Sequence, residues 1–401
     1  MKKSLVAVIA ALGACFVVVQ GAEAKTLEDI LKEKGVITEA DYKEVTKVKP
    51  FNYKLGSGFT FTSADEKFQT TIGGRMQYRY TFTDVDKATS TVNDSSKFEA
   101  KRIRLIVQGY AYSKDLTYKM EIDPVQLAQT DGRGGLLDSF VNYKVMDELQ
   151  LLVGQTKVKY GYTYIQSDGT LMFVDRVPFI TKMVPTYEIG AFAYGKIANG
   201  LFDYALSVTN GDGQTNAATT NHNAFAARVV MSPLGKMAND EPDLAIGKKP
   251  LFTIGANYFY NDLNAGESSS TYGTTWNNHK DLHNYGADAH FKWMGLAVQG
   301  EVLFTQGDVK TSTVQDRAMG WYAQAGYMVT PELGLAVRYS QFDPNRAVSG
   351  DLQTEQIGAI SYYFNKHNLK LQADVANLHN QKGAAAAQND MQYRAQVQLV
   401  F

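Results

Sequence analysis

Segments of about ten residues in which apolar and polar side chains alternate recur along most of this 401-residue chain. The clearest is Met391 to Phe401, where every second residue from Met391 onward is apolar or small and most residues between them are polar. Successive side chains of a strand point to opposite faces, so such a segment has one apolar and one polar face. Sixteen segments of this kind can be counted, at approximately 68–84, 97–113, 115–124, 135–146, 148–159, 188–198, 200–210, 222–233, 249–262, 281–294, 295–306, 317–330, 332–343, 353–366, 368–378 and 390–401.

The gaps between these segments alternate in length. Turns of about three residues, such as 113–115, 146–148, 198–200 and 330–332, occupy every second gap, and the gaps between them are longer and rich in Gly, Ser, Thr, Asn and Asp. Short periplasmic turns and long extracellular loops are typical of outer-membrane barrels. The pattern predicts an all-β fold, a transmembrane antiparallel β-barrel of about 16 strands. One turn-side gap, Ser232 to Lys249, is too long for this scheme.

A soluble β-sandwich or solenoid is the alternative fold. The position of the aromatic residues favours the barrel, because a sandwich does not need aromatic side chains near its strand ends, whereas a barrel uses them at the membrane interfaces. The residues concerned are Tyr78, Tyr80, Phe82, Tyr258, Tyr260, Trp293, Trp321 and Tyr327.

The first residues predict export. A basic start at Lys2 and Lys3, an apolar run to Val19 and the small residues Ala22 and Ala24 form a signal peptide over 1–24. The competing interpretation is a lipoprotein processed at Cys15. Residues 25–50 have helically spaced apolar residues and are predicted to be a short helical segment in the periplasm, followed by the barrel over 51–401.

Composition excludes several other classes of protein. Beyond residue 24 no apolar stretch approaches the ~20 residues of a membrane-spanning helix, and 40 basic residues nearly balance 41 acidic ones, so no nucleic-acid partner is indicated. Neither a Gly-x-Ser-x-Gly elbow nor a Walker-type loop is present, and the single cysteine leaves no pair for a metal. His279 and His283 are four residues apart in an extended segment, a weak signal for metal binding. We therefore expect no enzyme activity, no cofactor and no metal.

Alternation also indicates which side chains face the lumen. A sixteen-stranded barrel encloses water, so inward side chains should stay polar. This places Arg75, Arg79, Arg102 and Arg104 inward, and strand pairing without slippage would put Arg79 near Arg102 and Gln77 near Arg104. Like charges so placed repel each other. The alternative is that each arginine pairs with an inward acid, for which the candidates are Glu121, Asp123, Asp138, Asp288, Glu301 and Asp374.

The longest loop, Gly161 to Tyr187, is the natural constriction, because loops of this length tend to be functional. It contains Arg176 and Lys182, and Lys157 and Lys159 lie on the strand that leads into it. Folded into the lumen, the loop would bring these bases near the arginines. The alternative is a loop that lies over the mouth or at an oligomer axis.

Several motifs together resemble the phosphate-selective porin O and P family. They are FQTTIGGRMQY over 68–78, the basic strand KRIRL over 101–105, LTYKMEID over 116–123, LVGQ over 152–155 and the terminal VQLVF over 397–401. The resemblance covers about residues 65 to 401. It implies a sixteen-stranded homotrimeric porin whose lumen is lined by basic residues that draw anions inward. In this chain the fifth long loop, Leu263 to Asp281, carries Lys280 as its only base.

The expected function is a passive outer-membrane channel for small hydrophilic solutes and ions that prefers anions, with phosphate-type anions among the candidates. Its partners would be those solutes, the outer-membrane lipid and further copies of the chain. The alternatives are a weakly selective general porin and a structural or surface-binding barrel. The predicted anion-binding and pore-lining residues are Arg75, Arg79, Arg102, Arg104, Lys119, Lys157, Lys159, Arg176 and Lys182.

Overall fold

The computed structural model describes residues 27–40, 50–129, 134–215, 222–263, 279–309, 315–383 and 385–401. The predicted signal peptide, with Cys15, lies outside these residues, as does part of the predicted helical leader. The part of the leader that is described contains the helix α2 (Leu27–Glu33). Among the described residues no helix is both long enough and apolar enough to cross a membrane.

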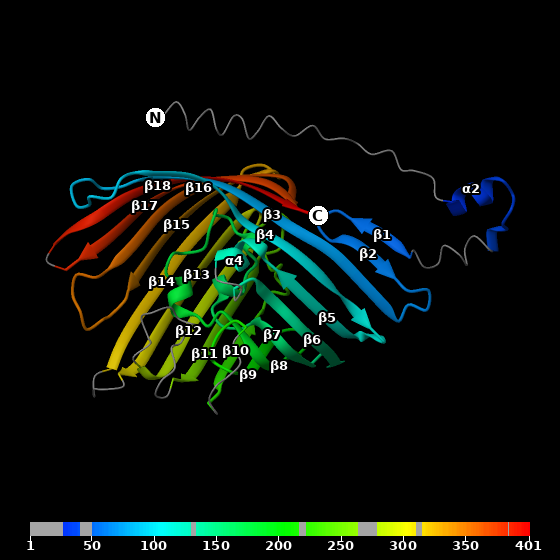
Figure 1. The fold of residues 1–401 in the computed structure, drawn as a ribbon, viewed down its shortest axis with the longest axis horizontal. Helices are drawn as coiled ribbons and strands as arrows, with labels where there is room; N and C mark the ends of the chain where they lie inside the picture. The colour runs from blue at the N-terminus through cyan, green and yellow to red at the C-terminus, as the bar shows by residue number, and fades with distance from the viewer. Residues whose placement is uncertain are drawn as a thin grey trace.

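The described residues form one sheet of eighteen strands, of which sixteen, β3 to β18, close into an antiparallel barrel (Figure 1). Consecutive strands pair with each other, and β18 pairs back with β3 from Met391↔Asp84 to Val400↔Arg75. The strands are β3 (Phe68–Asp84), β4 (Ser95–Ala111), β5 (Ser113–Ile122), β6 (Leu136–Met146), β7 (Leu149–Lys157), β8 (Tyr187–Ile197), β9 (Phe202–Thr209), β10 (Ala224–Met231), β11 (Leu251–Asp262), β12 (His279–Trp293), β13 (Leu296–Val309), β14 (Gln315–Met328), β15 (Leu333–Asp343), β16 (Gln353–His367), β17 (Leu369–Lys382) and β18 (Ala385–Val400). Each of the sixteen predicted segments overlaps one of these strands, so the predicted fold class is confirmed.

Alternation along each strand divides lipid-facing from lumen-facing residues. On β15, Leu335 and Val337 are 48% and 62% exposed on the outer surface, whereas Ala336 and Arg338, which alternate with them, are buried inside. The apolar side chains on the outside contact the membrane lipid. The backbone polar groups are hydrogen-bonded within the sheet, because every strand of the closed barrel has two neighbours.

Two short strands precede the barrel. β1 (Phe51–Lys54) and β2 (Gly58–Thr62) form a hairpin, and β2 pairs with β3 at Phe59↔Ile72. β18 uses the same edge of β3 from Arg75 onward, so β2 covers the part of that edge that β18 leaves free. Neither strand was predicted from the sequence, because four or five residues are too few to show a clear alternation.

The predicted register between β3 and β4 was wrong. Gln77 lies opposite Arg102 and Arg75 opposite Arg104, whereas Arg79 lies opposite Glu99. The reason is that β4 begins at Ser95, two residues earlier than predicted, and that a bulge follows Gln77 and shifts the pairing by one residue. The predicted Arg79–Arg102 pair is therefore absent, and the one direct arginine pair across these two strands is Arg75 with Arg104.

A long loop crosses the lumen between β7 and β8. It contains the helices α5 (Tyr162–Ile165) and α6 (Ile180–Met183) and the 3-10 turn η1 (Asp168–Thr170), and we call residues 158–186 the lumen loop. Its backbone is held by the far wall: Lys370 donates to the carbonyl of Leu171 (3.1 Å), and the N–H of Val174 donates to Asp374 (3.0 Å). A shorter loop with the helix α4 (Pro124–Gln129) follows β5. Of the two positions that the sequence allows for this loop, inside the lumen or over the mouth, the structure shows the one inside the barrel.

The expectation that inward side chains stay polar was only half right. Apolar side chains of the lumen loop form one buried cluster with inward residues of β10 to β15, which are Ala224, Ala226, Phe259, Leu282, Leu303, Ala318, Tyr322 and Phe342. On the loop side the cluster includes Val177, Phe179, Ile180 and Met183. A second buried cluster packs Met172 and Phe173 of the loop against Ala297, Ala336, Ile357 and Ala376 of the wall. The loop therefore docks through hydrophobic burial, which contributes about 25 cal/mol per Å² of apolar surface removed from water.

Candidate functional site

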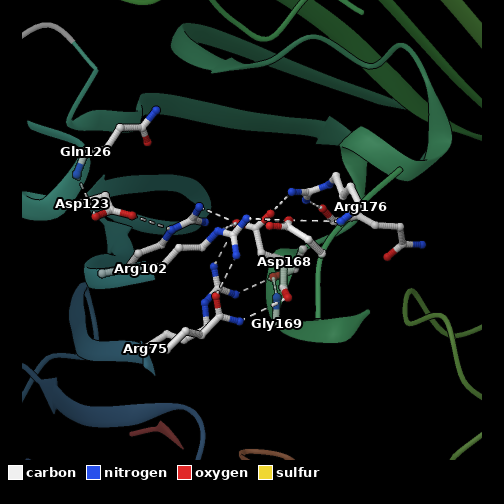
Figure 2. A network of polar contacts seen from close by, with 12 residues as sticks. Arg75, Arg102, Asp123, Gln126, Asp168, Gly169 and Arg176 are labelled. Atoms are coloured by element: carbon white, nitrogen blue, oxygen red, sulfur yellow. Dashed lines mark hydrogen bonds and ion pairs between the residues drawn. The ribbon is translucent and has the colours of Figure 1, made fainter. Parts of the chain in front are cut away.

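Four arginines surround the carboxylate of Asp168 in the lumen loop (Figure 2). Arg75 from β3 approaches it at 3.5 Å and Arg102 from β4 at 3.3 Å, while Arg104 and Arg176 donate to its oxygens directly. Asp168 itself is almost fully buried. A single carboxylate of the loop thus binds three guanidiniums of the barrel wall and one of the loop.

A second loop carboxylate, Asp175, continues this cluster. Arg79 contacts it at 2.8 Å and Arg102 at 3.0 Å, so Arg102 bridges Asp168 and Asp175. Burial alone would raise the pKa of Asp175, but Arg102 and Arg79 hold that pKa well below its usual range. Burial, with Arg102 nearby, lowers the pKa of Arg176 to about 9, which still leaves its guanidinium charged at neutral pH.

Carboxylates of β5 complete the cluster on the wall. Arg104 contacts Glu121 at 2.8 Å and Asp123 at 3.4 Å, and Lys119 contacts Glu121 at 2.7 Å. We call Arg75, Arg79, Arg102, Arg104 and Arg176, with Asp168, Asp175, Glu121 and Asp123, the arginine cluster. Five guanidiniums against four carboxylates leave one positive charge in excess.

The predicted lysines divide between this cluster and other places. Lys119 joins it through Glu121 and also contacts Asp138 at 2.6 Å. Lys157 donates to the carbonyls of Tyr164 (2.7 Å) and Gln166 (3.1 Å) and so lies beside Arg176, which binds the same Gln166 carbonyl. Lys159 and Lys182 lie elsewhere.

Lys182 is exposed on the lumen loop, 3.4 Å from Gln353 and above the ring of Phe342, so it is not beside Arg79 and Arg102 as the sequence analysis had expected. The helix α6 that carries it packs its buried residues Ile180 and Met183 into the apolar cluster on the opposite wall, and Lys182 is kept on that side of the barrel.

The arginines are therefore paired with acids, which was the alternative weighed in the sequence analysis. The six predicted inward acids are all buried in the lumen. Three further arginines with acid partners were missed: Arg394 with Asp374 at 2.6 Å, Arg338 with Glu355 at 2.9 Å and Arg228 with Asp288 at 2.7 Å. Their alternation along β10, β15 and β18 could have revealed these arginines. Asp168 and Asp175 lie in irregular backbone, where no periodicity indicates a direction.

The long turn 232–250 enters the lumen from the other end of the barrel. Its Glu241 is buried, accepts from the N–H of Met172 (2.8 Å) and donates its own N–H to the carbonyl of Thr170 (3.1 Å). Asp240 of the same turn binds Lys292 at 2.6 Å. The unusual length of this turn thus serves to reach and hold the lumen loop.

The histidines of β12 do not share a site. His279 contacts Asp316 at 3.1 Å, and His283 contacts the hydroxyl of Tyr258 at 2.7 Å. Within the described ranges, no group of three or more His, Cys, Asp or Glu side chains is arranged to hold a metal ion.

A closed barrel of sixteen strands with a loop folded into its charged lumen is the architecture of an outer-membrane porin. The model of the family described as phosphate-selective porin O and P matches residues 71–401. The chain belongs to this family, and it is an outer-membrane channel protein.

Relatives extend over nearly the whole chain. An uncharacterized protein of Aquifex aeolicus (strain VF5) is 24% identical over 413 residues, covering 91% of this chain and 93% of that protein. Among solved structures, the outer-membrane channel DcaP of Acinetobacter baumannii covers 86% of this chain and 100% of its own (12% identity, TM-score 0.56). An anion-selective porin from Comamonas acidovorans covers 83% and 99% (10% identity, TM-score 0.57), and Salmonella typhi OmpF in complex with daunomycin covers 84% and 99% (13% identity, TM-score 0.54). These structures share the fold of this chain.

Proposed function

We propose that this porin is a passive diffusion channel that prefers small anions, and that the lumen loop and the arginine cluster form its constriction. The observation that carries the proposal is the gathering of five arginines on the β3–β4 side of the lumen around four carboxylates, of which two belong to the lumen loop. We also propose that the channel assembles as a homotrimer and that residues 25–50 lie in the periplasm.

The physical basis is the field inside a narrow lumen. Two unit charges 5 Å apart interact by only ~0.8 kcal/mol in bulk water, but low-dielectric walls raise this several-fold. An excess of one positive charge at the narrowest part therefore biases ion traffic. The effect weakens as salt increases, because the screening length is ~10 Å at 0.1 M and ~3 Å at 1 M.

Two comparisons with known proteins also support a preference for anions. The family to which the chain belongs is described as phosphate-selective, and one protein of the same fold is an anion-selective porin. We extend this preference to the present chain on the strength of its arginine cluster, because a shared fold alone does not determine which ion a lumen favours.

A weakly selective general porin is the second candidate. The observation in its favour is that each arginine of the cluster contacts a carboxylate, so most of the positive charge is locally neutralised. The two candidates differ in the expected size of the zero-current potential under a salt gradient.

That potential tests the proposal directly. The wild-type channel in a planar bilayer should give ohmic current steps and a zero-current potential on the anion side. Replacing Arg79, Arg102 and Arg104 together with Gln leaves two guanidiniums against four carboxylates, so this potential should move past zero to the cation side, most strongly at ~0.1 M salt, where screening is weak.

A potential near zero for the wild type would favour the general porin, and one on the cation side would contradict the proposal. A control variant, Lys248→Gln, removes one positive charge from an exposed position on the 232–250 turn and should leave the potential unchanged.

A further inference from the structure

A cavity of about 410 Å³ lies inside the barrel, away from the arginine cluster. Its lining comes from β7 to β12, from the lumen loop and from residues 236–239 of the long turn. Pockets that bind small molecules are typically ~300–1,000 Å³. The cavity is therefore large enough for a small organic solute.

The charges that line the cavity do not balance. Four of its lining residues are basic, and two, Asp203 and Asp288, are acidic. Arg228 binds Asp288 through two hydrogen bonds of 2.7 and 2.9 Å, and Lys196 binds Asp203 at 3.1 Å. The two basic residues that remain are Lys159 and Lys236.

Neither lysine has a carboxylate within ion-pair distance among the residues that the structure describes. Lys159 follows β7 inside the barrel and is partly buried, whereas Lys236 is exposed on the turn. A partly buried ammonium without a counter-ion is costly, because burial removes water that the charge would otherwise bind. A bound anion would offset that cost.

The rest of the lining suits a planar apolar body. Tyr162 lies against His290, with ring centroids 3.5 Å apart, and the hydroxyl of Tyr194 donates to Asn142 at 2.9 Å, so both rings are held in place. Val230 and Ala205 add apolar surface. Aromatic rings fixed in this way can stack on a flat ligand at little entropic cost.

We propose that this cavity is a binding site for small organic anions, in which Lys159 binds the anionic group and Tyr162 and Tyr194 contact the body of the solute. The proposal rests on the proposed channel function, since it names a class of solute that the channel passes. It places recognition of this solute at Lys159, whereas the arginines of the cluster already bind the carboxylates of their own chain.

Benzoate is a suitable probe, with benzyl alcohol as a neutral ligand of the same shape. Calorimetric titration of the folded, detergent-solubilised protein should show benzoate binding, and Lys159→Gln should weaken it by at least about tenfold, the loss expected for one charge-assisted hydrogen bond. Lys248→Gln should bind benzoate like the wild type. Equal binding of benzoate by Lys159→Gln and wild type, or equal binding of benzyl alcohol and benzoate by the wild type, would overturn the proposal.

A second variant and a second readout separate this proposal from the proposed function. Lys236→Gln, a substitution at an exposed residue, should reduce benzoate affinity about threefold, because it removes a more distant charge. If neither lysine variant loses affinity for benzoate, the proposed site is wrong. Because there are two variants, poor folding of one still leaves the other as a test. The zero-current potential in KCl tests anion preference without benzoate. Anion preference without lysine-dependent benzoate binding refutes only the site, and benzoate binding in a cation-preferring channel refutes only the proposed selectivity.

Discussion

The backbone N–H of Met172 in the lumen loop donates a 2.8 Å hydrogen bond to the carboxylate of Glu241 in the 232–250 turn. The loop enters the lumen from the end of the barrel with the long connections, and the turn enters from the end with the short ones. A second contact, from the side chain of Gln299 on β13 to Glu241 (3.2 Å), fixes the carboxylate to the wall. The lumen loop is therefore held from both ends of the barrel.

Replacing Glu241 with Ala should loosen the lumen loop. The buried N–H of Met172 would lose its acceptor, at a cost of about 1–3 kcal/mol. We expect single-channel current with more frequent fluctuations and a larger mean conductance, because the loop would leave its docked position more often. Glu332→Ala, at an exposed turn residue, is the matched control and should conduct like the wild type. Unchanged noise and conductance in Glu241→Ala would show that the turn does not restrain the loop.

Asp168→Asn should have opposite effects on selectivity and stability. The substitution removes the carboxylate that four arginines share, so the zero-current potential should move further toward the anion side. Buried guanidiniums without their partner should destabilise the folded barrel by about 3–5 kcal/mol, measured by urea unfolding in lipid vesicles. Asp147→Asn, at an exposed acid on the turn between β6 and β7, should do neither. A shift toward cations would contradict the assigned role of Asp168.

The stabilising effect of Asp175 should depend on pH only under acid conditions. Because Arg102 and Arg79 lower its pKa in the folded state despite burial, its contribution is fully present above the unfolded pKa of ~3.9 and is lost as pH falls below that value. The difference in unfolding free energy between wild type and Asp175→Asn should therefore be constant from pH 7 to about 5 and shrink below about pH 4. If the difference in unfolding free energy changed between pH 5 and 7, the ionisation of Asp175 could not be the cause of that pH dependence.

The closure of the barrel should be sensitive to Gly74. Gly74 and Phe401 exchange two backbone hydrogen bonds of 2.8 and 3.0 Å, and a Cβ at Gly74 would lie 2.7 Å from the ring of Phe401. Gly74→Ala should reduce the heat-modifiable, folded fraction on gels, and deletion of Phe401 should do so as well. Gly358→Ala is the control, because a Cβ there meets no atom within 4 Å. A Cβ at Gly74 would also lie 2.8 Å from the backbone oxygen of Arg104, so full folding of Gly74→Ala would show that both the terminal ring and β4 can move aside.

The sequence predicted the strands of the barrel far better than the arrangement of the loop inside its lumen. Alternation over ten residues determines which way Arg75 or Arg102 points, because lipid on one side and lumen on the other impose a strict period of two. The partners Asp168 and Asp175 could not be found in this way, since the lumen loop has no repeating backbone. The apolar inward face at Phe259 and Leu303 was missed for the same reason, because it depends on what the loop places against it.

The far-wall contacts of the lumen loop also set an order of events during folding. The hydrogen bonds from Lys370, Gln372 and Gln398 to loop carbonyls, and from the loop N–H of Val174 to Asp374, join residues 199 to 229 positions apart in the chain. Contacts of such long range form late, after the entropy of closing a large loop has been overcome. The lumen loop can reach its final position only once β17 and β18 are in place, so a barrel that is still being assembled in the membrane lacks the docked loop in its lumen.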